Sequence, residues 1–355
     1  MRPIKPFSVI DIGSNSIRLV VFEEKSRSAI TLFNEKTQCG LGKNLGVSDK
    51  ISENSKIKAE TALSRYINIS RSMNAELCIV ATAAIRDSIN GNEFIQRINK
   101  IYAVDINILS SKEEARLSSL GVISSFRNIT GFIGDLGGGS LELASLSDKK
   151  YQYTSTLPLG TLRYAKVLNR DPKLIDKIDL YLSRIDWLVE EENKTFFVIG
   201  GAWRSFAKIH MSWSNYPISI IHNYSILTSE AIELCKVLSN LNTSVESMSI
   251  LSPSRKDSIS YSSLLLERIL LKVKPKNIVF SSFGLREGVL YDKLDSKEKK
   301  EDSLLLYCYK IGQKESRFFK NLLNFYSWML PLLVNFPTKE LRLIKAICLL
   351  SDISW

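Results

Sequence analysis

Two short glycine-containing stretches hold the residues whose types and spacing suggest chemistry. The first reads Asp-Ile-Gly-Ser-Asn-Ser over residues 11–16, and the second reads Asp-Leu-Gly-Gly-Gly-Ser-Leu-Glu over residues 135–142. Glycine lets the backbone approach an anion closely, and neighbouring N–H groups can then converge on a phosphate. Both stretches are entered from apolar residues, which predicts a strand, a phosphate-sized turn and a second strand. The candidate phosphate-binding residues are Gly13, Ser14, Asn15, Ser16, Gly137, Gly138, Gly139 and Ser140.

The two stretches are internal repeats of one another. Residues 11–20 align on residues 135–144 without a gap and share an acid, an apolar residue, glycine, serine and leucine at matching places. For either stretch alone, a plain glycine-rich hairpin turn is the simpler interpretation. The pair favours two related loops that grip a chain of phosphates from both sides of a cleft.

Carboxylates at the ends of these loops are candidates for a metal site. Asp11 and Asp135 hold equivalent positions, and Glu142 closes the second loop. Carboxylates beside a phosphate favour a divalent cation, and Mg²⁺ in such sites usually keeps several waters. The alternative is that both aspartates only start turns and that Glu142 faces solvent from its strand.

Hydrolysis of a phosphoanhydride also needs a base for the attacking water and positive charge on the terminal phosphate. Glu114, near the start of a predicted helix, is the candidate base. The alternative is a capping box over residues 111–114, in which Glu114 would only bond the first amide of the helix. Arg86 follows a buried strand and could supply a rigid cationic fork, although it could also be an ordinary surface arginine.

Bulk properties set the frame for these residues. The 355 residues exceed what a single core usually holds, so we expect two domains and an appendage. The net charge of +11 suggests an anionic partner, or merely a solvated face of scattered lysines. Five cysteines without a CxxC pair, and an N-terminus without a hydrophobic signal core, predict a cytoplasmic protein with no membrane span. The two histidines lack ligand spacing, so no zinc or di-iron site is expected.

Alternating and helical patterns predict two α/β units that position the candidate residues. Each unit opens with a strand, a glycine loop and two further strands, followed by helices and strands. A Lys-rich linker then leads into amphipathic helices. We therefore expect domains over residues 1–127 and 128–300, and a helical segment over residues 301–355.

At these residues the chain resembles the exopolyphosphatase and guanosine pentaphosphate phosphohydrolase family. That family belongs to the superfamily of actin, sugar kinases and heat-shock chaperone ATPases. The similarity covers residues 7–292. Its motifs stand in family order: Val-Ile-Asp-Ile-Gly-Ser-Asn-Ser at 9–16, Ala-Thr-Ala-Ala-Ile-Arg-Asp at 81–87, Glu-Glu-Ala-Arg-Leu at 113–117, the second glycine loop, Leu-Pro-Leu-Gly at 157–160, Gly-Gly-Ala-Trp-Arg at 200–204 and Arg-Glu-Gly at 286–288.

The resemblance implies an α/β protein with two ribonuclease-H-like, or actin-like ATPase, domains and an active site in the cleft between them. It implies Mg²⁺-dependent release of terminal phosphate from inorganic polyphosphate or from pppGpp. Glu114 matches the family's general base, although Glu113 stays an alternative. Glu142 matches its partner in placing water or metal, and Asp135 matches the carboxylate on the metal side, with Asp11 in the equivalent place.

The resemblance also bears on the phosphate contacts and on the end of the chain. Arg86, Asn15 and both glycine loops match phosphate contacts of the family. Longer members continue into an HD-like helical domain. Residues 349–353 resemble the start of its Leu-Leu-His-Asp-Ile motif, with Ser351 in place of histidine, which predicts an incomplete module without that metal site.

Two other functions remain open at this point. The chain could be a sensor that binds (p)ppGpp or polyphosphate without turnover, or an ATP-dependent kinase or chaperone of the same superfamily. Polyphosphate and pppGpp present the same terminal anhydride, so the sequence does not rank them. We expect no nucleic-acid or membrane partner, and apolar helix faces after residue 303 suggest a homodimer.

Overall fold

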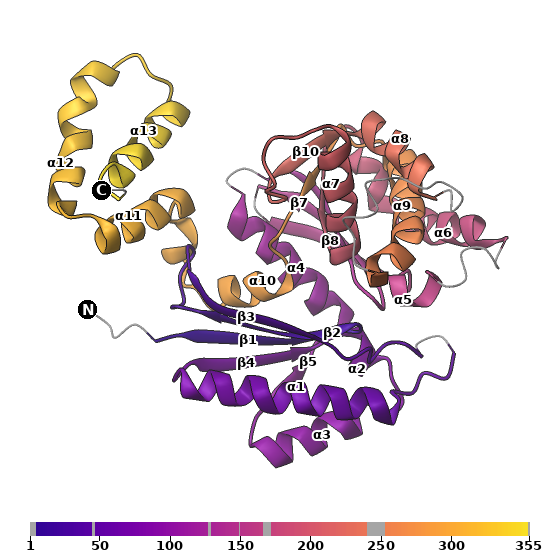
Figure 1. Cartoon of the computed structure of the whole chain (residues 1–355). Helices are drawn as coiled ribbons and strands as arrows, with labels where there is room; N and C mark the ends of the chain where they lie inside the picture. The colour runs from indigo at the N-terminus through magenta and orange to yellow at the C-terminus, as the bar shows by residue number, and fades with distance from the viewer. Residues whose placement is uncertain are drawn as a thin grey trace.

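The computed structural model describes residues 5–44, 47–126, 129–148, 150–165, 172–239 and 253–353. Two mixed β-sheets form the body of the molecule (Figure 1). The first has the strand order β3-β2-β1-β4-β5, and the second has the order β10-β11-β9-β6-β7-β8. The strands are β1 (Phe7–Ile12), β2 (Ser16–Phe22), β3 (Thr31–Gln38), β4 (Glu76–Ala81), β5 (Ile106–Ile108), β6 (Gly131–Leu136), β7 (Leu141–Ser147), β8 (Lys150–Leu157), β9 (Thr195–Ile199), β10 (Tyr224–Leu227) and β11 (Asn277–Phe280).

Both sheets are built on one plan, as the internal repeat predicts. In each, three antiparallel strands form a meander, and two further strands run parallel to the first strand of that meander. Asp11 pairs with Arg18 across β1 and β2, and Asp135 pairs with Glu142 across β6 and β7. The gapless alignment of the two loops is therefore confirmed residue by residue. The edge strand β10 was not predicted.

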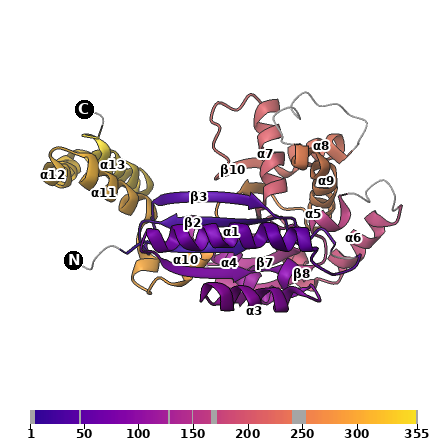
Figure 2. The same ribbon diagram turned by 60° about the horizontal axis from the view of Figure 1, so that its bottom comes forward.

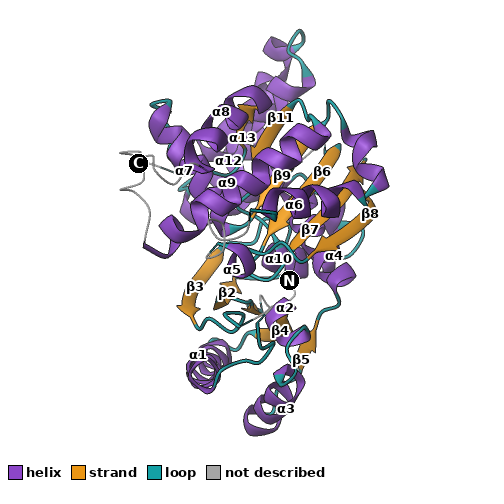
Figure 3. Cartoon of the chain, turned by 90° about the vertical axis from the view of Figure 1, so that its right-hand side faces the viewer, coloured by secondary structure: helices purple, strands orange, loops and turns teal. Residues whose placement is uncertain are grey.

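Helices cover the outer face of each sheet, as Figures 1 and 3 show. Their apolar stripes enter the core: Leu63 of α1 and Phe94 of α3 pack with the first sheet, and Trp203 of α7 and Leu265 of α9 pack with the second. These helices are α1 (Glu53–Ser72) and α3 (Gly91–Tyr102) on the first sheet, and α6 (Leu174–Ser183), α7 (Gly201–Trp213), α8 (Thr228–Ser239) and α9 (Pro253–Val273) on the second. Short helices complete the body: α2 (Ala83–Arg86), α5 (Thr161–Tyr164) and η1 (Asp186–Glu191).

Two helices, α4 (Ser111–Ser125) and α10 (Leu285–Asp292), lie between the sheets (Figure 1). They touch backbone to backbone at glycines. A Cβ atom on Gly288 would lie 1.8 Å from the carbonyl oxygen of Leu117, and one on Gly121 would lie 2.1 Å from that of Gly284. No larger residue fits either place without movement of the helices, so glycine sets their close crossing.

The C-terminal helices form a separate group beside the first sheet (Figures 1 and 2). They are α11 (Ser303–Glu315), α12 (Phe319–Met329) and α13 (Thr338–Leu350), with the short helices η3 (Glu298–Lys300) before them and η4 (Leu330–Leu333) between α12 and α13. Their buried core consists of Cys308, Ala346 and Leu349, whereas Trp328 and Ile347 are 70% and 66% exposed. A helical C-terminal segment is confirmed, and the homodimer stays a prediction. The domain boundary placed after residue 127 lies outside the described residues.

Within the ranges described above, no helix combines the length and the apolar composition needed to cross a membrane.

Candidate active site

The two glycine loops face one another across a cavity of about 190 Å³ between the sheets. Each loop has the same internal bond: the N–H of Gly13 donates to the carbonyl of Ser16 at 3.1 Å, and the N–H of Gly137 donates to that of Ser140 at 3.0 Å. The loops also meet directly, because a Cβ atom on Gly138 would lie 3.1 Å from that of Ser14. Of the nine candidate phosphate-binding residues, the eight in the two loops line this cavity and Arg86 does not.

The carbonyl groups of the first loop are bound by the segment that follows β3. The carbonyl of Ser14 accepts from the N–H of Gly42 at 2.8 Å, and that of Asn15 accepts from Gly40 at 3.0 Å. In a trans peptide the carbonyl and the next N–H point in opposite directions. The segment after β3 therefore holds the carbonyls on one side and leaves the N–H groups of Asn15 and Ser16 for the other.

The second loop is held in the same way by α5. The carbonyl of Gly137 accepts from the N–H of Thr161 at 3.1 Å, and that of Gly139 accepts from the side chain of Arg163 at 2.7 Å. Gly160, just before α5, makes this approach possible, because a Cβ atom there would lie 2.2 Å from the carbonyl carbon of Gly139. The glycine of the Leu-Pro-Leu-Gly motif thus supports the second loop.

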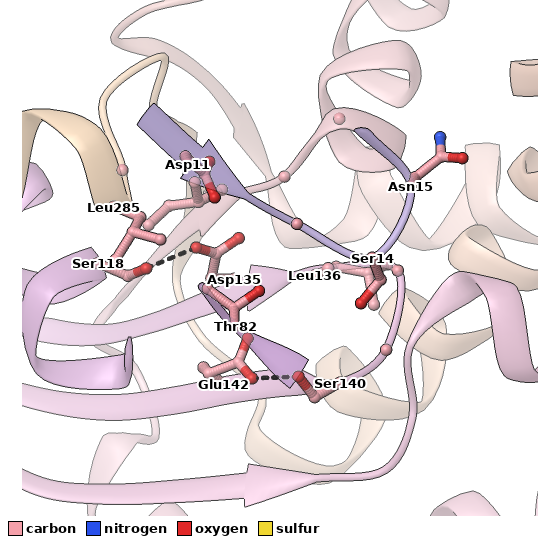
Figure 4. Close-up of a pocket in the computed structure, with 18 of the residues that line it drawn as sticks. Asp11, Ser14, Asn15, Thr82, Ser118, Asp135, Leu136, Ser140, Glu142 and Leu285 are labelled. Carbon is pink, nitrogen blue, oxygen red and sulfur yellow. Dashed lines mark hydrogen bonds between the residues drawn. The ribbon is translucent and has the colours of Figure 1, made fainter. Parts of the chain in front are cut away.

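Four acids line the same cavity: Asp11, Glu114, Asp135 and Glu142. Figure 4 shows Asp11, Asp135 and Glu142 along one side of the pocket, with Asn15 pointing away from them. The hydroxyl of Ser118 donates to Asp135 at 2.7 Å, and a second serine hydroxyl, from the loop itself, donates to Glu142. Glu142 is only 3% exposed, so the solvent-facing alternative for this residue is wrong.

These acids disfavour one another's negative charge. Burial raises the pKa of Asp11 and of Asp135, and it raises the pKa of Glu142 well above its ordinary value. The charges of Glu114 and Asp135 raise the pKa of Glu142 further. A bound cation would reverse this effect by favouring the ionised forms.

The cluster of acids fits Mg²⁺ in one particular way. Its donors are carboxylate oxygens, which Mg²⁺ prefers, but no three Asp, Glu, His or Cys side chains within the described ranges stand close enough to enclose an ion. Mg²⁺ commonly binds through one or two carboxylates and completes its shell with water and phosphate oxygens. The residues therefore suit an ion that arrives with a phosphate.

Glu114 reaches the cavity because α4 begins one residue earlier than the capping alternative required. The hydroxyl of Ser110 accepts from the N–H of Glu113 at 3.2 Å, so Ser110 caps the helix and Ser111 does not. The capping role considered for Glu114 is therefore wrong. Glu113 forms an ion pair with Arg116 at 2.7 Å and does not line the cavity, whereas Glu114 does.

Arg86 acts on Glu114 in this structure and does not line the cavity. Its guanidinium donates to the carboxylate of Glu114 at 2.7 Å, to the carbonyl of Leu109 at 3.1 Å and to Asp87 at 3.0 Å. Burial nevertheless raises the pKa of Glu114 to about 7, because the negative charges of Asp135 and Asp11 add to the effect and the nearby Arg86 offsets only part of it. A direct contact between Arg86 and phosphate stays a prediction.

Two arginines on the cavity wall were given no role in the sequence analysis: Arg204 of α7 and Arg286 of α10. Arg286 pairs with Asp11 at 2.9 Å. Among the described residues, Arg204 donates only to the carbonyl of Ser282, at 3.5 Å, and it forms no ion pair with a carboxylate there. Burial, with the positive charges of Arg286 and Arg18, lowers the pKa of Arg204 to about 10. An anion bound in the cavity would therefore stabilise the charged form of Arg204.

A signal for these arginines did exist in the sequence. Each follows a glycine turn that joins a strand to a helix, at Gly200 and Gly284. Such turns stand at the carboxyl ends of strands, where ligands bind in α/β sheets. Gly200 has a φ angle of +109°, which glycine adopts without strain.

The duplicated sheet order and the phosphate-sized loops facing one cleft define a protein of the actin-like ATPase fold, built from two ribonuclease-H-like halves. The model of the Ppx/GppA phosphatase family matches residues 20–297, so the chain belongs to that family.

Similar proteins agree with this assignment. The chain is 25% identical to Exopolyphosphatase 1 of Mycobacterium tuberculosis over 304 residues. The matched region covers 81% of this chain and 88% of the relative. It is 27% identical over 313 residues to a bifunctional 3-dehydroquinate synthase/phosphatase of Fusobacterium nucleatum, covering 81% of the chain and 46% of that protein.

Solved structures show the same fold. The Aquifex aeolicus member of the Ppx/GppA family has a TM-score of 0.68 at 20% identity, covering 84% of this chain and all of the other. An exopolyphosphatase from Cytophaga hutchinsonii has a TM-score of 0.69 at 22% identity, covering 81% of this chain and 97% of the other.

Proposed function

We propose that the protein hydrolyses phosphoanhydride bonds and releases the terminal phosphate of inorganic polyphosphate, of pppGpp, or of both. One observation carries the proposal: Glu114, a carboxyl with a pKa near neutrality, lies on the wall of the cavity that both glycine loops line. The exopolyphosphatases among the relatives support polyphosphate as the substrate class. The family description supports a phosphatase.

The loops and the arginines divide the work of holding the phosphates. The N–H groups of both loops bind the anhydride chain from two sides, as backbone amides do in other phosphate sites. Arg204, which forms no ion pair with a described carboxylate, binds the terminal phosphate, and Arg286 stabilises it from beside Asp11. Positive charge at this place is worth most in the transition state, when charge builds on the phosphoryl oxygens and on the leaving oxygen.

Glu114 acts on the water. Its carboxylate orients the attacking water in line with the bond to be broken and accepts a proton as the new P–O bond forms. The bridging oxygen then leaves with the shortened chain. Arg86 keeps the carboxylate in place through its bond at 2.7 Å, and the raised pKa makes Glu114 a stronger base than an exposed glutamate.

Asp135 and Glu142, with Asp11 on the facing hairpin, would hold Mg²⁺ beside the terminal phosphate. When bound, the ion neutralises charge on the phosphoryl oxygens and on the surrounding carboxylates. Ser118 and Ser140 keep Asp135 and Glu142 oriented toward the cavity through their hydrogen bonds.

The test is a comparison of Glu114→Gln with Glu113→Gln in phosphate release from tripolyphosphate and from pppGpp, with Mg²⁺ present. Loss of a general base typically lowers the rate by about 10²- to 10⁴-fold, so the Glu114 variant should lose that much and the Glu113 variant little. A Glu114→Gln protein as fast as the parent would refute the mechanism. Tight binding of both substrates without release by the parent would instead identify a sensor.

A further inference from the structure

A second cavity, of about 450 Å³, lies where the turn after β2, the end of α4, α10 and the start of α11 meet. Its volume falls in the range of small-molecule sites, roughly 300–1,000 Å³. Phosphate release, as proposed above, does not use it. The cavity therefore requires a separate explanation.

Aromatic side chains form much of its wall. Phe22, Phe283 and Tyr291 line it, and His222 stacks on Phe283 with ring centres 5.0 Å apart and an angle of 24° between the planes. The N–H of Ser282 donates to Nδ1 of His222 at 3.3 Å, and burial lowers the pKa of this histidine. In this arrangement Nδ1 of His222 is an acceptor, and the ring packs face to face with Phe283. Flat aromatic walls of this kind suit a planar ring.

One wall residue also carries a positive charge without a carboxylate partner. Arg27 donates to the carbonyl oxygens of Lys299 at 2.7 Å and Glu301 at 2.6 Å, and none of the ion pairs among the described residues includes it. Arg342, the other arginine on the wall, is neutralised by Asp302 at 2.6 Å. An anionic group would complete the charge balance at Arg27.

We propose that this cavity binds a small planar-ring anion, either an aromatic carboxylate or a heteroaromatic phosphate monoester. The anionic group lies on Arg27, and the ring lies among the aromatic side chains. Glu287, on the same wall, accepts from the N–H of Gly284 at 2.9 Å, and its charge turns the anionic end of the ligand toward Arg27.

The two cavities share a short stretch of chain, residues 282–287. Gly284 and Arg286 line the catalytic cavity, whereas Phe283 and Glu287 line the second one. A ligand that packs on Phe283 therefore acts on the segment that holds Arg286 against Asp11. We expect its binding to change the affinity of the catalytic cavity for a phosphate chain, and the reverse by the same factor. This coupling rests on the proposed function, but the binding itself does not.

The test uses the full chain with Glu114→Gln, so that tripolyphosphate is not consumed. Indole-3-carboxylate and adenosine 5′-monophosphate, which represent the two anion types, are titrated by calorimetry with and without saturating tripolyphosphate. We expect one equivalent of at least one probe to bind in both conditions. Failure of both probes to bind overturns the proposal. So does a probe affinity that falls without limit as tripolyphosphate increases, because the probe would then occupy the catalytic cavity.

Variants place the probe in the second cavity. Arg27→Met should weaken binding by about tenfold or more, the usual effect of losing a charged hydrogen bond. Lys25→Met removes the same charge from the same turn, outside the cavity, and should change affinity by less than about twofold. Ser125→Phe places a bulky ring in the cavity from the α4 wall and should abolish binding. Parental affinity in the Arg27 and Ser125 variants, with unchanged melting, contradicts the site.

Coupling is measured separately, as the tripolyphosphate affinity with and without bound probe. A shift in that affinity supports coupling, and an unchanged affinity with the probe bound overturns it. Absence of tripolyphosphate binding in every condition counts against the proposed function, while the probe titration still decides whether the second site exists.

Discussion

Arg18 and Glu142 occupy the same position in the two repeated hairpins. Arg18 stands opposite Asp11 on β2, and Glu142 stands opposite Asp135 on β7. The first hairpin thus pairs a negatively charged side chain with a positively charged one, whereas the second pairs two negatively charged side chains. Because only the second concentrates negative charge, the cation should bind mainly there.

The repeat supplies its own matched pair of variants for this prediction. Glu142→Gln should weaken Mg²⁺ binding by about tenfold or more, because a charged ligand is lost. Arg18→Met changes the equivalent place in the first hairpin and should leave Mg²⁺ affinity the same or slightly higher, since a nearby positive charge is removed. Calorimetric titration of Mg²⁺ with a bound tripolyphosphate, in the Glu114→Gln background, measures both. Equal losses in the two variants would show that the hairpins share the ion evenly.

We expect Arg204 to contribute to substrate binding and not to the stability of the free protein. Arg204→Met removes a buried guanidinium that has no ion pair among the described carboxylates, so the melting temperature without substrate should stay level or rise. The same change should raise KM for tripolyphosphate by about ten- to a hundredfold, because a charged hydrogen bond to phosphate contributes about 1.5–3 kcal/mol. Arg204→Lys should recover part of the affinity. A large fall in stability with unchanged KM would mean that Arg204 serves the fold.

The pH dependence of activity should follow Glu114. Burial raises its pKa to about 7, and the base must be ionised to accept a proton, so kcat/KM should fall as pH drops below about 7. The profile of phosphate release at saturating Mg²⁺ measures this. A bound cation nearby shifts the midpoint to lower pH, so lowering the Mg²⁺ concentration should move it upward. A profile flat down to pH 5 would exclude Glu114 as the base.

The carboxyl of Glu114 should also affect how the stability of the protein depends on pH. Because its pKa is raised by folding, the folded protein keeps the proton to a higher pH than the unfolded chain does. The contribution of Glu114 to stability therefore falls as pH rises from about 4.5 to about 7. Glu114→Gln removes this slope, so its melting temperature relative to the parent should be higher at pH 8 than at pH 5. An identical pH dependence in the two proteins would contradict the burial argument.

Gly160, which packs against the second loop, and Gly137, which lies in that loop, should differ sharply in their tolerance of a methyl group. Gly160→Ala places a Cβ atom 2.2 Å from the carbonyl carbon of Gly139, and such overpacking typically costs about 1–3 kcal/mol of stability. Gly137→Ala meets only the carbonyl of Ser140 at 3.4 Å, an ordinary contact, and serves as the stability control. Denaturant unfolding of both variants gives the comparison. Equal stabilities would mean that α5 moves aside without strain.

Local features of the sequence were sufficient to predict the loops and both sheets. The glycines, acids and flanking apolar residues of each loop are neighbours in the chain, so their pattern is visible without the fold. The four-residue strand β10 escaped because so short a segment has no measurable period. The cap of α4 was misplaced by one residue because Ser110 and Ser111 are chemically equal, and only backbone geometry distinguishes them.

Contacts made by folding could not be read in this way. Arg286 meets Asp11 from 275 positions away along the chain, and Arg204 reaches the cavity only because α7 follows β9. Arg86 was expected to face phosphate from the end of its strand. The structure turns it to Glu114, 28 positions further on, because a buried carboxylate there competes for its guanidinium.

The crossing of α4 and α10 at Gly121 and Gly288 bears on how such a repeated chain can be divided. Leu117 of α4 is buried with the strands of the first sheet, and Val122 of the same helix is buried with those of the second. From α10, Val289 enters the core of the first sheet, although α10 follows the last strand of the second. A helix of each repeat thus packs against the sheet of the other. The halves would therefore be more stable as fragments expressed together than apart, because the inner face of each sheet is covered in part by a helix of the other repeat.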